Sequence, residues 1–389
     1  MNFTIESKEI YSPELFNGRA LLAVENGRVS AIGEAAGVKR LLVPGYRLVP
    51  GLVEVQINGA FGEDFTNDPT AIWRVGARLP DLGITTFLPT VITNPLETVR
   101  LAMDTWMTGP PEGYTGARIP GMHLEGPFLN PQKKGAHNPK YMRPPALNDI
   151  RDWDPQHGIC LVTLAPELPG ASQLIETLTT RGVVVSAGHS QASSIEARAG
   201  FAAGIHCGTH LFNAMPPLDH REPGLAGALL DEERLYTGLI VDGIHVAPEM
   251  VRLTWRLKAP DRLVLVTDAM AALGMPAGEY DLADARVRVD EKSARLADGT
   301  LAGSILNPLD AVYNLQQIAG CSLASAVTCF TRNPAQMVRQ DMLGRLQPGS
   351  SADMLLLDEE NRLAATLVGG ELVYSAPWAQ LNWDENTLA

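Results

Sequence analysis

Eight short runs of apolar, often β-branched residues recur along the middle of the chain, and a longer amphipathic stretch follows most of them. Alternating strands and helices over about 290 residues are typical of a (β/α)8 barrel, an α/β fold of the TIM type. A doubly wound sheet is the alternative, but no GxGxxG or Walker loop favours it. The predicted strands lie at 52–57, 84–88, 118–124, 159–164, 183–187, 204–209, 237–241 and 262–267.

Both ends of the chain contain strand-like sequence around turn signals. Residues 21–32 hold two apolar runs around Glu25-Asn26-Gly27, and residues 365–375 turn at Gly369-Gly370. We therefore expect one small, discontinuous β-sandwich domain built from residues 1–49 and 345–389. The barrel then occupies residues 50–344, with a β insertion near 277–300.

Charge and cysteine usage narrow the class of protein. The formal net charge is −13, from 31 basic and 44 acidic residues, which argues against a nucleic-acid-binding or anionic-membrane surface but leaves a local basic pocket possible. No secretory signal or membrane span is apparent. The four cysteines are far apart and have no CxxC pairing, so we expect a reduced, cytoplasmic protein. They are Cys160, Cys207, Cys321 and Cys329.

Polar side chains that can carry chemistry stand at the carboxyl end of nearly every predicted strand. In a barrel these ends converge on one face, where active sites lie. The pattern therefore favours an enzyme with its site at that face. The residues are Gln56, Asn58, Thr90, Glu125, Glu167, His189, His210, Asp242, His245 and Asp268.

Glu125, His189 and His210 are ligand types that zinc prefers, and each follows an apolar run that can hold it rigidly. Two imidazoles, one carboxylate and an open position indicate a catalytic site rather than a closed structural one. Taken singly, a strand-end histidine can also be a hydrogen-bonded structural residue. Asp268 can act as an acid/base toward activated water, or it can be the N-cap of a helix.

Several segments together resemble the amidohydrolase superfamily and, within it, the N-acetylglucosamine-6-phosphate deacetylase family. The likeness spans about residues 16–373 and is most specific in HLFNAMPP followed by REPGLAG. It rests on PGLVEVQINGAFGEDF, GMHLEGPFLNPQKKGAHNP, SAGHS, GTHLFNAMPPLDHREPGLAGA, VDGIHV, LVTDAM, LAGSIL and GRLQPGSSADMLLLD.

The resemblance implies metal ligands at Glu125, His189 and His210 and a catalytic acid/base at Asp268. Many amidohydrolases hold a second metal with His-x-His at the end of the first strand. Here that position reads Gln56-Ile57-Asn58, and amides are much weaker zinc ligands than imidazoles. We therefore expect one divalent ion per subunit, Zn²⁺ before Fe²⁺, Co²⁺ or Mn²⁺.

The resemblance also implies hydrolysis of N-acetyl-D-glucosamine 6-phosphate to D-glucosamine 6-phosphate and acetate in amino-sugar metabolism. It implies a homodimer in which Arg221 reaches the phosphate in the neighbouring subunit. The alternative for Arg221 is an ordinary surface arginine, and for His137 a plain loop histidine. The substrate-binding residues implied are Ala136, His137, Asn213, Ala214, Arg221, His245, Leu301, Ala302 and Gly303.

Three other functions remain to be weighed. N-Acetylgalactosamine 6-phosphate differs from the gluco sugar only at the 4-hydroxyl, and no residue visibly decides between them. Cyclic-amide hydrolysis is disfavoured by Gln56-x-Asn58 and by the HLFNAMPP segment. A non-catalytic barrel scaffold is disfavoured because all four of the implied ligand and acid/base residues are present.

Overall fold

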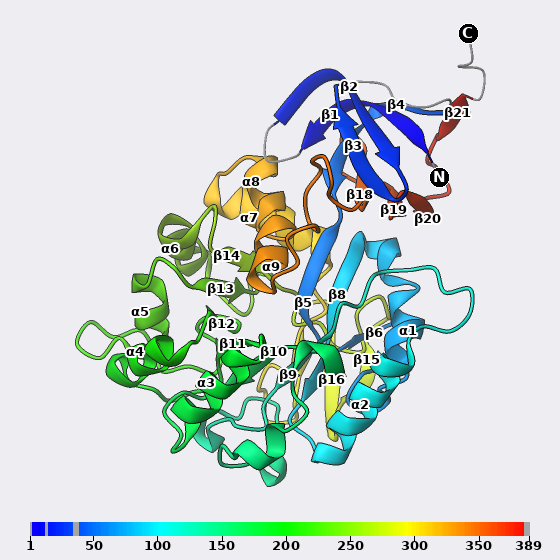
Figure 1. Ribbon diagram of the computed structural model, residues 1–389. Helices are drawn as coiled ribbons and strands as arrows, with labels where there is room; N and C mark the ends of the chain where they lie inside the picture. The colour runs from blue at the N-terminus through cyan, green and yellow to red at the C-terminus, as the bar shows by residue number, and fades with distance from the viewer. Residues whose placement is uncertain (1, 12–14, 34–38, 385–389) are drawn as a thin grey trace.

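The computed structural model describes residues 2–11, 15–33 and 39–384. Figure 1 shows a barrel of strands ringed by helices, with a smaller sheet above it that is built from segments near the start and the end of the described chain. The predicted ranges 1–49 and 345–389 extend into residues outside this description. Within the described residues, no helix is long and apolar enough to cross a membrane.

The eight predicted strands form one sheet whose neighbours follow chain order, and the ladders between them are parallel. This arrangement confirms the (β/α)8 prediction. The strands are β5 (Leu52–Ile57), β8 (Ile84–Ile92), β9 (Met122–Glu125), β10 (Ile159–Leu164), β11 (Val184–Ala187), β12 (Cys207–Gly208), β13 (Tyr236–Leu239) and β14 (Leu263–Leu265).

Helices cover the outside of the barrel (Figure 1). They bury their apolar faces in one hydrophobic core that they share with the strands. The link from β9 to β10 contains only 3₁₀ turns, which is the clearest departure from strict strand–helix alternation. The helices are α1 (Ala71–Gly76), α2 (Leu96–Thr108), α3 (Ala171–Thr180), α4 (Ser194–Ala203), α5 (Gly224–Asp231), α6 (Pro248–Lys258), α7 (Pro308–Ala319), α8 (Leu323–Thr328) and α9 (Arg332–Met337).

The barrel closes through contacts between β5 and the segment that directly follows β14. The Asp268 N–H donates to the Gln56 carbonyl at 2.9 Å, and the Thr267 N–H donates to the buried Glu54 carboxylate at 2.9 Å. The other oxygen of Glu54 accepts the Gln56 N–H at 2.9 Å. Closure of the barrel thus fixes the end of β5 against the segment that carries Asp268.

The smaller sheet is mostly antiparallel and has its own core, which contains residues from both ends of the chain. The predicted hairpin turns at Asn26 and Gly27, where φ is +51° and +75°, as a two-residue turn of this kind requires. Its strands are β1 (Phe3–Tyr11), β2 (Leu15–Glu25), β3 (Arg28–Ile32), β4 (Arg40–Pro50), β18 (Met354–Leu357), β19 (Leu363–Val368), β20 (Glu371–Ser375) and β21 (Asn382–Asp384).

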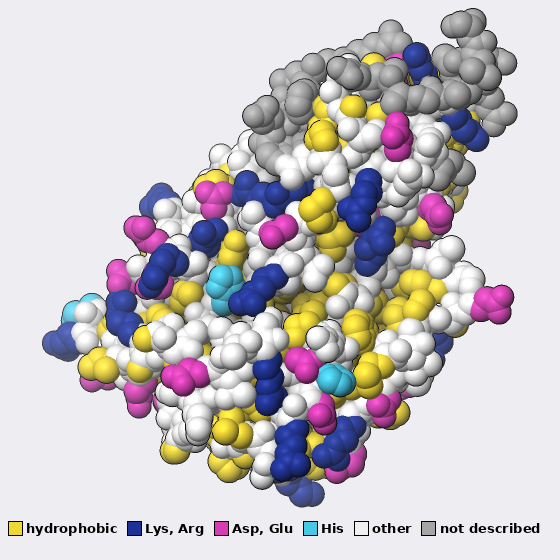
Figure 2. All heavy atoms as spheres, in the orientation of Figure 1, with side chains coloured by type: hydrophobic (Ala, Val, Ile, Leu, Met, Phe, Trp, Pro, Cys, Tyr) yellow, Lys and Arg dark blue, Asp and Glu magenta, His cyan; other side chains and the backbone are white. Residues whose placement is uncertain are grey.

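An inserted three-stranded sheet follows β14, close to the predicted range 277–300. It packs through a small apolar cluster over the segment that follows Asp268. Its strands are β15 (Gly278–Leu282), β16 (Ala285–Val289) and β17 (Ala294–Arg295), and a separate pair is β6 (Gly59–Ala60) with β7 (Glu63–Asp64). Figure 2 shows acidic and basic side chains interspersed over one face of the molecule.

Candidate active site

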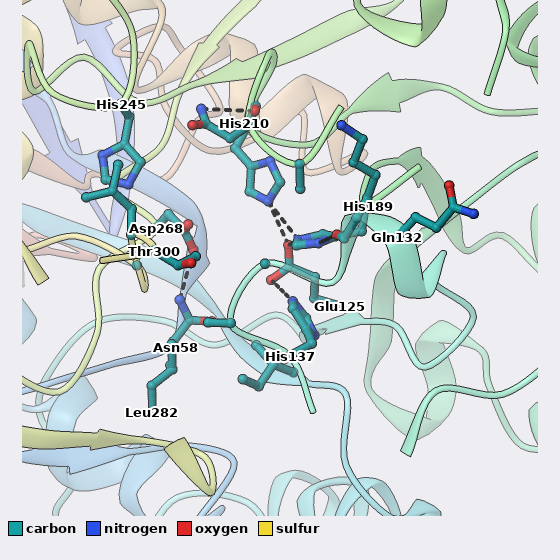
Figure 3. Close-up of a pocket in the computed structure, with 18 residues that line it drawn as sticks. Asn58, Glu125, Gln132, His137, His189, His210, His245, Asp268, Leu282 and Thr300 are labelled. Carbon is teal, nitrogen blue, oxygen red and sulfur yellow. Dashed lines mark hydrogen bonds and ion pairs between the residues drawn. The ribbon is translucent and has the colours of Figure 1, made fainter. Parts of the chain in front are cut away.

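The carboxyl ends of the barrel strands surround a cavity of about 320 Å³ (Figure 3). Most of the residues predicted for the site meet there. Those that line the cavity are Glu125, Ala136, His137, His189, His210, Asn213, Ala214, His245, Asp268, Leu301 and Gly303.

Glu125, His189 and His210 point toward one another at the centre of this cavity (Figure 3). Glu125 is the last residue of β9, and each histidine lies two residues beyond its strand. Glu125 Oε1 is 3.1 Å from His189 Nε2 and 3.1 Å from His210 Nε2. The two Nε2 atoms are 3.1 Å apart, and all three side chains are buried.

The position of the ring proton of His189 indicates what the triangle of Glu125, His189 and His210 can bind between its three side chains. The carbonyl oxygen of Lys133 lies 2.8 Å from His189 Nδ1, so the ring proton sits on Nδ1 and donates to that carbonyl. His189 Nε2 therefore turns a lone pair toward the carboxylate. Lone pairs that converge in a buried space need a cation between them. A divalent metal ion fits this donor set, which is the one found in catalytic zinc sites.

The two amides that replace His-x-His are both engaged with the site. Gln56 Nε2 donates to Glu125 Oε1 at 3.1 Å, and Asn58 Nδ2 donates to Asp268 Oδ1 at 2.9 Å. Each amide therefore orients a carboxylate.

Asp268 is buried at the edge of the cavity. Burial, and then the negative charge of Glu125, raises the pKa of Asp268. The alternative reading of Asp268 as a helix N-cap is wrong, because a turn rather than a helix follows at residues 271–275. The raised pKa suits a carboxylate that must both take and give a proton near neutral pH.

His137 lies against the same triangle. The Thr93 N–H donates to His137 Nδ1 at 3.3 Å, so the ring proton is on Nε2, which is 3.8 Å from Glu125 Oε2. Burial, and then the neighbouring His189, lowers the pKa of His137 to about 3. His137 is therefore a neutral N–H donor that faces the cavity.

His245 is held by a carboxylate outside the cavity. Asp242 Oδ2 is 2.6 Å from His245 Nδ1, and the Asp242 side chain also caps the turn by accepting the His245 N–H. This leaves the other ring nitrogen for a ligand. Asn213 and Ala214 lie in an irregular segment in which Ala214 has a φ of +52°.

Two predicted substrate residues do not line the cavity. Arg221 is exposed on the loop before α5. Ala302 is fully buried in the apolar cluster of the insertion, and its N–H donates to the Ala294 carbonyl. Only its neighbours Leu301 and Gly303 face the cavity.

Sequence reasoning missed the partners of the predicted residues. Thr93 was overlooked because β8 was expected to end at residue 88, which made Thr90 the polar residue after the strand. The strand in fact extends to Ile92, so the first polar residue after it is Thr93. Gln132 and Lys133 also line the cavity, and Lys133 Nζ donates to the Met215 carbonyl at 2.8 Å. The sequence offered one signal for these residues: the strand that ends in Glu125 is followed by a stretch without an α-helix, and such a stretch can fold over the site.

Comparison with known proteins agrees with this geometry. A curated N-acetylglucosamine-6-phosphate deacetylase from Mus musculus is 39% identical over 85% of this chain and 84% of its own length. An N-acetylgalactosamine-6-phosphate deacetylase from Escherichia coli O157:H7 is 36% identical over 84% of this chain and 87% of its own.

A solved structure of a mutant N-acetyl-D-glucosamine-6-phosphate deacetylase from Mycobacterium smegmatis, in complex with N-acetyl-D-glucosamine-6-phosphate, gives a TM-score of 0.88 at 34% identity. The similarity covers 96% of this chain and 100% of that one. The amidohydrolase family profile matches residues 47–377. With most of the chain matched and a barrel whose strand ends present a metal-binding triangle, the chain belongs to the amidohydrolase family.

Proposed function

We propose that the protein hydrolyses N-acetyl-D-glucosamine 6-phosphate to D-glucosamine 6-phosphate and acetate. The observation that carries this proposal is the buried triangle of Glu125, His189 and His210 in one cavity with Asp268 and the neutral donor His137. Deacetylases of this substrate are similar to the chain over most of its length.

The metal would be held by Glu125 Oε1, His189 Nε2 and His210 Nε2, with zinc the metal that best suits two imidazoles and a carboxylate. When bound there, a divalent ion lowers the pKa of water and polarises the carbonyl oxygen of an amide. Gln56 and Asn58 donate their amide N–H groups to carboxylates, and their amide oxygens are much weaker zinc ligands than imidazoles, which supports one ion per subunit.

Asp268 is the group that moves the proton. With Oδ1 held by Asn58, the carboxylate accepts a proton from the attacking water and later delivers it to the sugar nitrogen as the amine leaves. His137 Nε2–H donates to the oxygen that becomes negative as water adds to the acetyl carbonyl. The Thr93 N–H keeps the His137 proton on the nitrogen that faces the cavity.

Substrate binding would draw on the rim of the same cavity. A phosphate dianion needs a cation and amide donors, which His245 and the segment at Asn213 and Ala214 can supply. The backbone at Ala136, Leu301 and Gly303 would contact the sugar. Holding both ends of the substrate orients the acetamide for attack.

Besides His245, a second positive group for the phosphate would come from Arg221 of a neighbouring subunit. Leu218 and Leu257 are 42% and 48% exposed and line one groove beside α4, on which Ile195 is 80% exposed. Exposed apolar side chains gathered on one face mark an interface. Burying them in a homodimer would carry the nearby loop with Arg221 toward the partner's cavity.

The state of the cysteine thiols supports a cytoplasmic setting. All four cysteines are unpaired, and three of them are buried. Free thiols without disulfides are usual in a reducing compartment. The cytoplasm, where phosphorylated sugars are metabolised, is the expected location.

The decisive experiment measures release of free amine from N-acetylglucosamine 6-phosphate before and after chelation, with the unphosphorylated sugar as control. We expect turnover that needs metal and is confined to the phosphorylated sugar. Equal turnover of both sugars would remove the phosphate site from the proposal.

The galacto epimer is the second candidate, because the Escherichia coli relative named for it is 36% identical to this chain. The same assay with N-acetylgalactosamine 6-phosphate separates the two. A larger kcat/KM for the galacto sugar would replace the proposed substrate while leaving the site chemistry in place.

A further inference from the structure

We infer that Glu167, which does not line the cavity, is a positioning residue that sets the geometry of His189 as a metal ligand. The inference rests on the proposed metal site. Glu167 lies three residues beyond β10 and is partly buried.

The Glu167 carboxylate joins two loops that are distant in sequence. Oε1 accepts hydrogen bonds from Asn130 Nδ2 at 2.9 Å and from the Gln191 N–H at 2.6 Å. Oε2 accepts one from Ser190 Oγ at 2.7 Å. One side chain thereby ties the loop after β9 to the loop after β11.

On the first of these loops, Asn130 begins the 3₁₀ turn Pro131–Lys133, whose first free N–H its side chain accepts. The Asn130 N–H also donates to the His189 carbonyl at 2.9 Å. This turn presents the Lys133 carbonyl to His189 Nδ1. Because that contact decides which ring nitrogen carries the proton, holding Asn130 in place keeps the His189 lone pair on the metal-facing side.

On the second loop, Ser190 and Gln191 directly follow His189, whose φ of +49° lies in the left-handed region. Such a conformation persists only when neighbouring contacts hold it. The Ser190 hydroxyl and the Gln191 N–H make two of those contacts by donating to Glu167. A carboxylate suits the position because it accepts from all three partners with a full negative charge. In a carboxamide only one oxygen accepts, so the Ser190 hydroxyl would have to reverse its role, and all three bonds would lose the charge that strengthens them.

The test is Glu167→Gln, with Zn²⁺ affinity measured by competition against a chromophoric chelator in the absence of substrate. We expect the dissociation constant for Zn²⁺ to rise roughly 10- to 100-fold, the usual effect of losing a group that orients a ligand. Excess zinc should then restore turnover. The rise in unfolding temperature on adding zinc should shrink, while the metal-free protein unfolds near the wild-type temperature.

Glu176→Gln is the matched control, because Glu176 is exposed on α3, the helix that follows the same strand. Its zinc affinity should equal that of wild type. If Glu167→Gln does not fold, Ser190→Ala and Asn130→Ala each remove one donor and should weaken zinc binding by roughly three- to tenfold.

Zinc affinity within twofold of wild type in Glu167→Gln would overturn the inference. So would equal losses of unfolding temperature with and without metal, since these indicate a purely structural role. Failure of the deacetylase proposal is recognised separately, as zinc-loaded wild type that releases no amine from the phosphorylated sugar. In that case the zinc-binding comparison still decides the role of Glu167.

Discussion

Three residues that meet in the cavity have backbone angles that L-amino acids rarely adopt. φ is +49° at His189, +30° at His210 and +49° at Asp268. Non-glycine residues in this region carry strain of order 1–3 kcal/mol each and concentrate at functional sites. All three lie just beyond a barrel strand, where the change of backbone direction turns the side chain into the cavity. Contacts from neighbouring loops must hold that strain.

Replacing Asp268 tests the proton transfer at the scale of one residue. Asp268→Asn keeps the shape of the side chain and removes the base, so kcat should fall by about 10²–10⁴-fold or more. Zinc content per subunit should stay at the wild-type value, because Asp268 is outside the ligand triangle. Amine release and metal analysis of the same preparation check both points, and wild-type turnover would remove Asp268 from the mechanism.

The residue types of the site could be predicted from the sequence, but their partners could not. Glu125 and Asp268 were recognisable because each ends an apolar run. Their hydrogen bonds to Gln56 and Asn58 join residues 69 and 210 positions apart. Spacing along the chain carries no information about such pairs, since the barrel brings them together only when it closes.

At the scale of elements, strand existence was predicted better than strand ends. The run at 159–164 became β10 without change because all its residues but Thr163 are apolar and none is glycine or proline. The run at 204–209 shrank to Cys207–Gly208, since Gly204, with a φ of +128°, still belongs to the end of α4. Pro120 and Gly121 likewise delay β9 until Met122. Glycine and proline therefore decided where apolar sequence became a strand.

Lys258, the last residue of helix α6, should make the stability of the fold depend on pH. Lys258 is 3% exposed and its ammonium donates to the carbonyls of Glu232 and Leu235. Burial lowers the pKa of Lys258 to about 8, below its unfolded value. Between pH 8 and about 10.5 the unfolded chain then binds more protons, so this group makes the fold more stable as pH rises.

The check is the unfolding temperature of wild type and Lys258→Met from pH 7 to about pH 11. The difference between them should shift in favour of wild type as pH rises through 8 and approach a constant value near 10.5. A difference that does not change with pH would show that the Lys258 ammonium is as well solvated in the fold as in the unfolded chain.

At the scale of the whole molecule, Asp353 joins the small sheet to the barrel. It is 3% exposed, and its carboxylate accepts hydrogen bonds from Arg118 Nε at 3.1 Å, the Gly369 N–H at 2.6 Å and Ser351 Oγ at 2.9 Å. Asp353→Ala removes the acceptor of the buried Ser351 hydroxyl and of the half-buried Gly369 N–H and should cost about 2–4 kcal/mol of stability. Denaturant unfolding against the exposed control Asp341→Ala measures it, and equal stability of the two variants would contradict this role.

The proposed dimer predicts that binding of the phosphorylated sugar depends on contact between two subunits. Arg221→Ala should raise KM for the phosphorylated sugar by roughly 10-fold or more, the loss expected for a charge-assisted hydrogen bond. Ile195→Asp, which places a charge on the exposed apolar face, should separate the subunits and raise KM in the same way. The control is Leu101→Asp. Leu101 lies on α2 and is 51% exposed, and its replacement should change neither the association of the subunits nor KM.

Mixing two impaired variants decides whether Arg221 acts across the interface. When Arg221→Ala and Asp268→Asn subunits exchange, half of the dimers are mixed, and one cavity in each has both an intact Asp268 and an intact partner arginine. Random exchange should therefore restore roughly a quarter of the wild-type sites, because a two-fold interface pairs each loop with the other subunit's cavity. If Arg221 serves its own cavity, no mixed dimer is complete, and the activity stays at the sum of the two variants.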